Sequence, residues 1–397
     1  QHRSGAGASA CRRLLSCVLA ALLFAGAAPA AAQVSFAGDA RIRPRLDLDD
    51  RTGDPTKGYE STRLYYMYRL RLDMTAAIGG GYALKTRLGH NGIAYYGRAG
   101  RGQLPDVLGE ENTTSDDTGR RVSLDLMYLY MTRATEHFGF DAGLIPVPGF
   151  ANPLWDLHYY PDLMVDIPYF LYSTDGGFGV RAYVDAGPGR LQGWALLDRP
   201  TGEVRENGAD VTLRDGNNQY TLAASYALPI AGFTLEPMVF KALSASIEES
   251  PGGVVDSARS GSFNAPLTVG AALTFPRVAG LVPALWAGWS RSDVAGSLDA
   301  PMPAYRAWLG RAKLTGDIGP GRLTAWLDVG RRTDELAGGD IATDYANVWL
   351  NYAFTVYRGE RGSFSIGPEW RIIDVSRGDD TLRRRHKLEI NFDAAFR

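Results

Sequence analysis

The 397-residue sequence has few of the side chains that form covalent cross-links, metal centres or nucleophiles. It contains two cysteines, Cys11 and Cys17, and five histidines. Because both cysteines lie near the start, the rest of the chain has no disulfide framework, no thiolate metal site and no cysteine nucleophile. The histidines beyond residue 32 lie in four separate segments, at His90, His137, His158 and His386. The sequence therefore predicts no metal site and no cofactor.

Motifs for catalysis and for nucleotide binding are also missing. There is no Walker loop, no Rossmann fingerprint and no His-Glu-x-x-His sequence. Neither His137 nor His158 is accompanied by a serine and aspartate in a catalytic pattern, so we predict no catalytic residue and no enzymatic activity. The net charge of -2 gives no reason to expect a nucleic-acid partner.

Long apolar stretches are confined to the first 32 residues. Three arginines precede an apolar stretch from Leu14 to Ala28, and an Ala-x-Ala sequence ends at Ala32. This composition is typical of a cleavable secretory signal peptide and too short for an anchored transmembrane helix. We therefore expect a signal peptide over residues 1–32 and a mature chain over 33–397. Removing three arginines and no acids from a net charge of -2 leaves the mature chain at -5.

The mature chain instead shows a strict two-residue alternation, clearest in residues 60–77. One parity is apolar and the other is charged: Leu64, Tyr66, Tyr68, Leu70, Leu72 and Met74 alternate with Arg63, Arg69, Arg71 and Asp73. Successive side chains on a strand point to opposite faces, so this segment predicts a strand with one apolar and one charged face. A charged residue facing lipid costs about 2–4 kcal/mol at the bilayer midplane, so the apolar parity is expected to face outward.

Sixteen such segments follow one another, separated by glycine- and proline-rich turns. They cover residues 34–47, 60–77, 82–95, 121–135, 138–146, 177–186, 190–199, 217–228, 232–247, 264–275, 281–293, 303–316, 321–333, 343–357, 362–376 and 382–396. Tight turns, such as 78–81 and 187–189, alternate with longer polar connections, such as 96–120 and 147–176. This pattern predicts an all-β fold, a transmembrane antiparallel β-barrel of about 16 strands, with short periplasmic turns and long outer loops. Counts of 14 or 18 strands and a soluble β-sandwich are the alternatives.

Basic residues gather on the inward parity of the first and last segments. We call this set the basic wall: Arg41, Arg43, Arg45, Arg63, Arg69, Arg71, Lys85, Arg87, Arg383 and Arg385. Closure of the barrel would place it on one continuous surface, because the last strand then pairs with the first. One interpretation is that the basic wall sorts solutes by charge. The other is that these side chains solvate a polar interior and pair with Asp39, Asp47 and Asp73.

The connection at 147–176 is too apolar and aromatic for a solvated surface loop. Together with the preceding segments around Glu136-His137-Phe138-Gly139 and Gly143 to Phe150, it resembles Gram-negative outer-membrane porins. The strand pattern extends that resemblance over residues 34–396, chiefly to general diffusion porins, with some similarity to polysaccharide-export and phosphate-selective porins. In this family the third loop folds into the barrel and narrows the channel. The resemblance implies an acidic side of a constriction formed by Asp156, Asp162, Asp166 and Asp175. A loop that merely fills or caps the barrel is the alternative.

The final segment alternates from Leu388 to Phe396 and resembles the signal by which the barrel assembly machinery recognises its clients, although Arg397 follows the phenylalanine. The expected function is that of a porin, a passive channel for small hydrophilic solutes with charge-dependent selectivity. A substrate-specific channel for anionic solutes or acidic oligosaccharides is the alternative, and a plugged adhesive barrel is a third possibility. The expected location is the outer membrane. Expected partners are its lipid and lipopolysaccharide, the assembly machinery and further copies of the chain in a homotrimer, for which Gly193 and Ala195 provide small outward residues.

Overall fold

The computed structural model describes most of the predicted barrel and part of its loops. The described residues are 33–54, 58–90, 97–99, 106–107, 124–147, 152–159, 176–199, 203–206, 209–212, 219–244, 266–292, 295–296, 301–302 and 304–397. The predicted signal peptide, residues 1–32, lies outside these ranges. So do three of the four predicted constriction residues, Asp162, Asp166 and Asp175.

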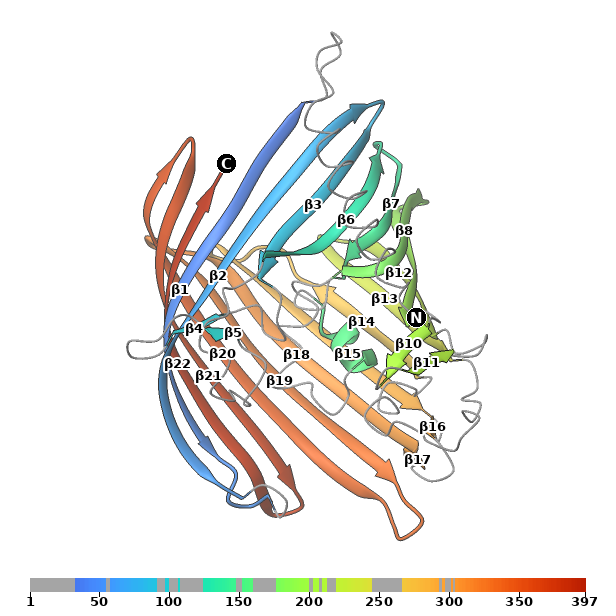
Figure 1. Cartoon of the computed structure of the whole chain (residues 1–397), viewed down its shortest axis with the longest axis vertical. Helices are drawn as coiled ribbons and strands as arrows, with labels where there is room; N and C mark the ends of the chain where they lie inside the picture. Colours follow the sequence, from blue (N-terminus) through green and yellow to red (C-terminus); the bar gives the residue numbers. More distant parts are fainter. Residues whose placement is uncertain are drawn as a thin grey trace, which may run out of the picture.

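Sixteen long strands form one closed antiparallel barrel (Figure 1). They are β1 (Val34–Asp50), β2 (Glu60–Gly79), β3 (Tyr82–His90), β6 (Leu124–Ala134), β7 (Phe138–Pro146), β8 (Gly176–Ala186), β9 (Gly189–Arg199), β12 (Gln219–Ile230), β13 (Phe233–Ser244), β14 (Leu267–Thr274), β15 (Leu281–Ser292), β18 (Ala304–Ile318), β19 (Gly321–Glu335), β20 (Ile341–Gly359), β21 (Gly362–Arg377) and β22 (Asp380–Phe396). Each pairs with the next of these strands along the chain, and β22 pairs with β1. The predicted fold and the count of sixteen are confirmed, and the sandwich is excluded.

Short elements that the sequence did not predict lie in the long connections. Strand β4 (Gly97–Ala99) pairs with β2 and with β5 (Asp106–Val107). Two small hairpins join β10 (Glu203–Glu206) to β11 (Ala209–Thr212) and β16 (Ala295–Gly296) to β17 (Pro301–Met302). The helix α2 (Pro153–Tyr159) lies in the third long connection. No helix in the described part of the chain has the length and apolar character needed to cross a membrane.

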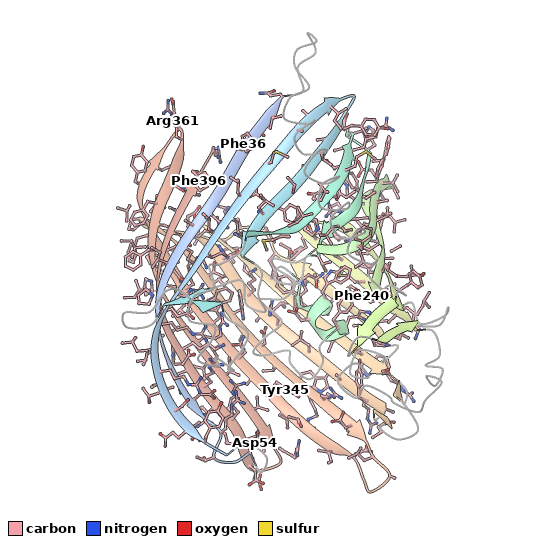
Figure 2. All side chains as sticks on the ribbon, viewed as in Figure 1. Phe36, Asp54, Phe240, Tyr345, Arg361 and Phe396 are labelled. Atoms are coloured by element: carbon pink, nitrogen blue, oxygen red, sulfur yellow. The ribbon has the colours of Figure 1, made fainter. Side chains whose placement is uncertain are left out.

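The two faces of the barrel wall differ as the alternation predicts, with side chains projecting to both sides of the ribbon (Figure 2). On β22 the outward-facing Leu388 and Ile390 are 42% and 47% exposed, whereas the inward-facing Glu389 is 4% exposed. Outward aromatic residues near strand ends, including Tyr220, Phe233 and Trp308, are also exposed. The charged side of the wall therefore lines the interior of the barrel.

Two of the short turns share a sequence and a stabilising contact. Gly-Pro-Gly-Arg joins β8 to β9 at residues 187–190 and β18 to β19 at residues 319–322. In the first turn, the Tyr226 hydroxyl donates to the Ala186 carbonyl oxygen at 2.7 Å. In the second, the Tyr352 hydroxyl donates to the Ile318 carbonyl oxygen at 2.5 Å. A tyrosine on the following strand thus holds each turn in place.

Candidate functional site inside the barrel

Helix α2 lies inside the barrel, packed against β14, β15 and β18 (Figure 1). Asn152 starts it: the Asn152 side-chain oxygen accepts a hydrogen bond from the Leu154 amide at 3.1 Å, and Pro153 takes the first helical position. Asparagine before proline at this point is a favourable helix start. The side chains of Leu154, Trp155 and Leu157 are fully buried. This part of the third loop therefore occupies the interior of the barrel.

Two facing glycines form the seat of α2. Gly270 on β14 and Gly288 on β15 are cross-strand partners on the inward face. A Cβ atom at Gly270 would lie 2.9 Å from both terminal methyl carbons of Leu154, and one at Gly288 would overlap Leu154 more severely. Only glycine lets the helix approach this closely, because any larger residue would occupy the space that Leu154 fills. We call these two residues the glycine seat.

An apolar cluster holds the helix on this seat. The Trp155 ring lies edge-on to Phe240, with centroids 4.8 Å apart, and edge-on to Trp194, at 5.6 Å. Buried side chains from seven strands belong to this cluster, including Ile145, Leu196, Tyr305 and Leu309. A buried aromatic side chain of this kind contributes several kcal/mol, so α2 is a firmly packed element.

Two ionisable side chains of α2 are buried with it. His158 is 1% exposed; its Nδ1 lies 3.0 Å from the Thr268 hydroxyl and its Nε2 lies 3.3 Å from the Thr221 hydroxyl. Burial, together with the smaller effect of the nearby Lys241, lowers the pKa of His158 to about 3. The histidine is therefore neutral at ordinary pH and packs its ring against Phe240.

Asp156, a predicted constriction residue, is also buried, with 1% exposure. Neither of its carboxyl oxygens has a hydrogen-bond partner among the described residues. Burial raises the pKa of Asp156 well above its usual range; Arg311 opposes this effect and Asp328 adds to it. In this position the side chain faces packed atoms rather than open space. Its assignment to an acidic side of a constriction remains a prediction, but burial favours the neutral carboxyl.

The opposite pKa shifts of Asp156 and His158 predict opposite pH responses in two single variants. In Asp156→Asn only His158 titrates: docking of α2 is constant above about pH 6.5, the pKa of a free histidine, and weakens by about 1.4 kcal/mol per unit as the pH falls toward 3. In His158→Gln only Asp156 titrates, and docking weakens by about 1.4 kcal/mol per unit as the pH rises above about 4. The fluorescence of Trp155 on the same helix, obtained between pH 4 and 8 as the difference from a matching Trp155→Phe variant, reports how firmly the helix is held. Identical pH profiles in the two variants would contradict this account.

The predicted basic wall lies on β1, β2, β3 and β22, and most of its members form ion pairs. Asp39 pairs with Arg69 and Arg71, at 2.9 and 2.7 Å. Further pairs join Arg41 to Asp393, Arg43 to Glu389 at 2.7 Å, Arg45 to Asp47 at 2.6 Å, Arg87 to Asp73 at 2.6 Å, Arg383 to Asp49 at 3.0 Å and Arg385 to Asp47 at 2.6 Å. Pairing with Asp39, Asp47 and Asp73, the second interpretation of these arginines, is thus present in the structure. Lys85 is half-buried and Arg63 is exposed.

Cations still outnumber carboxylates on this wall. Apart from Arg377 at a hairpin end, the inward-facing charged residues of β1, β2, β3, β21 and β22 are twelve basic and seven acidic, an excess of five positive charges. The basic ones are the ten residues of the basic wall with Arg371 and Lys387, and the acidic ones are Asp39, Asp47, Asp49, Asp73, Glu369, Glu389 and Asp393. We call these nineteen residues the charged wall. After every carboxylate of the charged wall is matched with a basic residue, five positive charges remain. This excess supports the prediction that the basic wall sorts solutes by charge.

The charged wall and α2 lie on opposite sides of the barrel. In the order of the sixteen strands, β13 is the ninth, and it carries Phe240 against the helix. It is therefore eight strands away from β1, half the circumference. The side of the interior next to α2 is lined mainly by apolar side chains, with the buried Arg311–Asp328 pair on β18 and β19, whereas the opposite side is charged.

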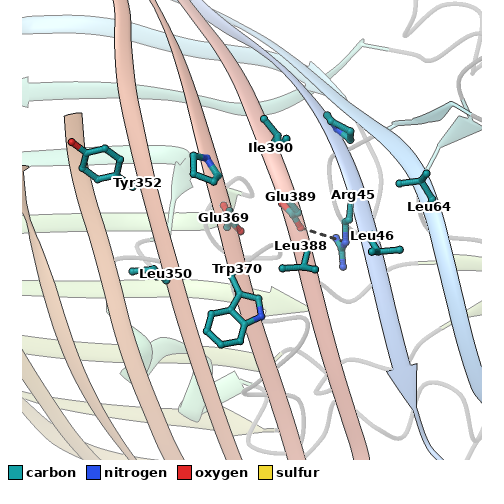
Figure 3. A pocket seen from close by; sticks show the side chains of 12 residues that line it. Arg45, Leu46, Leu64, Leu350, Tyr352, Glu369, Trp370, Leu388, Glu389 and Ile390 are labelled. Atoms are coloured by element: carbon teal, nitrogen blue, oxygen red, sulfur yellow. Dashed lines mark ion pairs between the residues drawn. The ribbon is translucent and has the colours of Figure 1, made fainter. Parts of the chain in front are cut away.

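The charged wall includes the seam where the barrel closes. The β1–β22 ladder is interrupted between the pairs Ile42–Phe392 and Arg45–Glu389, at Pro44, which has no amide hydrogen to donate. Arg43 bridges this gap: its Nε donates to the Asn391 side-chain oxygen at 2.6 Å. On the outward side a shallow apolar hollow of about 460 Å³ lies over the same strands, and Figure 3 shows Arg45 and Glu389 together at the seam.

Sequence reasoning missed several inward-facing residues. Arg371, Glu369 and Asn391 form a buried hydrogen-bonded group on β21 and β22. Trp326 and Trp349 face each other across β19 and β20, with the guanidinium of Arg371 5.1 Å from the Trp349 ring. Alternation alone would have placed all of these inside. The sequence Asn152-Pro153 is typical of a helix start and could have predicted α2. No residue near Gly270 or Gly288 in the sequence indicates that they form the glycine seat.

Comparison with solved structures finds the same fold in several outer-membrane proteins. An anion-selective porin from Comamonas acidovorans has a TM-score of 0.51 at 11% identity, covering 92% of this chain and 100% of that one. OmpF of Salmonella typhi, in complex with daunomycin, has a TM-score of 0.51 at 10% identity, covering 92% and 99%. A loop-deletion mutant of OmpT from Vibrio cholerae has a TM-score of 0.50 at 11% identity, covering 91% and 99%. No protein-family description and no curated protein sequence matches the chain. The chain thus has the fold of Gram-negative outer-membrane porins.

Proposed function

We propose that the protein is an outer-membrane porin, a passive channel for small hydrophilic solutes that favours anions. One observation carries the proposal: α2 fills one side of the barrel interior, and a charged wall with an excess of positive charge faces it. Water and solutes would then pass along the charged half. A wall of one dominant sign raises the local concentration of oppositely charged solutes and repels those of like charge.

Single-channel recording tests the channel directly. The refolded mature protein, added to a planar bilayer in KCl, is expected to give stable open steps of uniform size. Swelling of protein-loaded liposomes should follow the entry of small sugars and amino acids. Folded protein that inserts but never conducts would contradict the proposal and would favour a plugged, adhesive barrel.

A substrate-specific channel for anionic solutes or acidic oligosaccharides is the second candidate. The row of inward residues Lys313, Trp326, Trp349, Arg371 and Lys387, which are cross-strand partners on five neighbouring strands, favours it. These side chains offer N–H donors and aromatic faces without a single carboxylate. A specific channel would show saturable flux and a current blocked by its ligand, whereas a diffusion channel would show neither.

The remaining expectations belong to the same proposal. Residues 1–32 would direct export, and the barrel would reside in the outer membrane, in contact with its phospholipid and lipopolysaccharide. The alternating final strand would serve recognition by the barrel assembly machinery. The protein would act without catalysis and without a cofactor. A homotrimer would bring outward surfaces such as that of Ala195 together, and chemical cross-linking in the membrane would reveal it.

Two neighbouring substitutions on β2 test the membrane orientation of the faces. Leu70 faces outward and is 40% exposed, whereas Arg69 faces inward and pairs with Asp39. Leu70→Arg should impair assembly, because a basic residue facing lipid costs about 2–4 kcal/mol at the midplane. Arg69→Ala should assemble and change ion selectivity. The yield of heat-modifiable folded barrel on gels measures assembly, and equal yields from both variants would show that the face assignment is wrong.

A further inference from the structure

The two ends of the barrel carry opposite charge in the described residues. The short turns and strand ends at 133–138, 185–190, 275–281, 317–322 and 357–362 hold six arginines and four acidic residues. The described hairpin segments at the other end, 50–54, 58–60, 334–341 and 377–380, hold eight acidic residues and two arginines. Figure 2 shows Arg361 at the first end and Asp54 at the other. We call the end with the six arginines the basic rim.

Most arginines of the basic rim are available for an external partner. Asp185 pairs with Arg190 at 2.7 Å, and Asp317 lies 3.9 Å from Arg322. The other four, Arg133, Arg277, Arg358 and Arg361, form no ion pair with any described residue. Arg277, Arg358 and Arg361 are also exposed. An exposed guanidinium without a carboxylate suits an anionic group from outside the chain, above all a phosphate, because two phosphate oxygens can accept hydrogen bonds from the planar guanidinium fork.

Arg133 indicates what kind of partner that is. It projects from the outward face of β6, and its guanidinium carbon lies 5.0 Å from the Tyr82 ring centroid and 4.9 Å from that of Phe138. Phe138 is 40% exposed on the outward face, next to Phe140, which packs edge-on against Tyr82. The guanidinium thus lies among rings on the surface that faces lipid in the proposed function, not in the aqueous turn.

The same end carries further outward aromatic residues. Phe36, Phe233, Tyr357 and Phe396 are between 36% and 61% exposed there, and Phe233 packs against Phe275 beside the turn that holds Arg277. Aromatic side chains with arginines at one level mark the depth of lipid headgroups in a membrane. Exposed aromatic side chains around the arginines suit a lipid partner better than an acidic soluble protein, which would bind the arginines without them.

We propose that the basic rim binds the phosphate groups of anionic phospholipids in the adjacent leaflet through Arg133, Arg277, Arg358 and Arg361. This inference rests on the proposed location in the outer membrane and assigns a lipid ligand to the protein there. The flanking rings hold the acyl region against the barrel, and the guanidinium groups extend toward the headgroup.

Native mass spectrometry of the mature protein, released from nanodiscs of equal phosphatidylglycerol and phosphatidylcholine, tests the proposal. The protein should retain phosphatidylglycerol over phosphatidylcholine by at least about fivefold, the factor expected from one arginine at an anionic surface. A variant with Arg133, Arg277, Arg358 and Arg361 all changed to glutamine should retain the two lipids equally. The control changes Arg51, Arg306, Arg331 and Arg377 to glutamine, which alters net charge by the same amount away from the basic rim, and should keep the enrichment.

Equal retention of both lipids by the unmodified protein would overturn the proposal. So would full enrichment in the basic-rim variant, or equal loss in the variant and its control, which would point to net charge alone. The same preparations are recorded in planar bilayers. A protein that conducts without lipid enrichment overturns the lipid site and leaves the channel standing. A protein that retains phosphatidylglycerol but does not conduct overturns the channel and leaves the lipid site standing.

Discussion

Replacing Gly288 by valine is expected to lift α2 from the barrel wall. The new side chain would occupy the space of Leu154 and crowd Leu157, and overpacking of this kind costs about 1–3 kcal/mol. Because the helix would lose the glycine seat, it would no longer be fixed in one position. The open channel should then show fluctuating sub-levels in place of one steady current.

A buried thiol measures the release of the helix independently. Ala307 on β18 is 2% exposed and belongs to the apolar cluster beneath α2. The only cysteines are Cys11 and Cys17, so Ala307→Cys provides the single reactive thiol in protein produced without residues 1–32. A water-soluble thiol reagent should modify this cysteine about 5- to 150-fold faster when Gly288→Val is also present. This factor corresponds to the overpacking cost of about 1–3 kcal/mol.

The matched control is Gly310→Val, one strand away. A Cβ at Gly310 would lie 3.6 Å from the nearest Val329 carbon, an ordinary contact on the outward face. This variant should leave both the thiol reactivity and the steady current unchanged. If Gly288→Val behaved like Gly310→Val, α2 would not be held by the glycine seat.

The second large effect is expected at the seam, from Glu389→Gln. The Glu389 side chain is fully buried and lies 2.7 Å from Arg43 and 3.4 Å from Arg45. Removing one partner of a buried ion pair typically costs about 3–5 kcal/mol, because the remaining charge is left in a low-dielectric site. The loss should be concentrated at the β1–β22 closure, where Pro44 already interrupts the ladder.

Urea unfolding of the barrel in lipid vesicles measures this loss. Glu335→Gln is the control: Glu335 is partly exposed and lies 3.6 Å from Arg306, so about 0–1 kcal/mol is expected. If both variants unfolded at the same urea concentration, the buried pair would not stabilise the seam.

Strand positions and faces were predictable from the sequence because each depends on local information. Alternation assigns Leu70 and Arg69 to opposite faces, and glycine and proline mark the turns, so sixteen strands were found with small errors at their ends. The predicted strand 34–47 extends to Asp50 in the structure, for example. In every such case the signal lies within a few residues of the feature it predicts.

The interior arrangement was less predictable because it depends on register and on distant residues. Arg43 and Glu389 are 346 positions apart and meet only when the barrel closes with one particular register. Likewise, Asp156 was predicted to face a passage. Its burial depends on Gly270 and Gly288, which are far along the chain and leave room for the helix. A local pattern shows that a loop is apolar, but it does not show what the loop packs against.

If solutes pass along a wall with excess positive charge, the reversal potential under a KCl gradient is the most direct measurement of it. The expected reversal potential has the sign that marks preference for chloride over potassium. Changing Arg69, Arg71 and Lys85 together to glutamine should shift this potential toward zero. A preference for potassium in the unmodified protein, or a potential that these three changes leave unaltered, would show that the charged wall does not select the permeating ions.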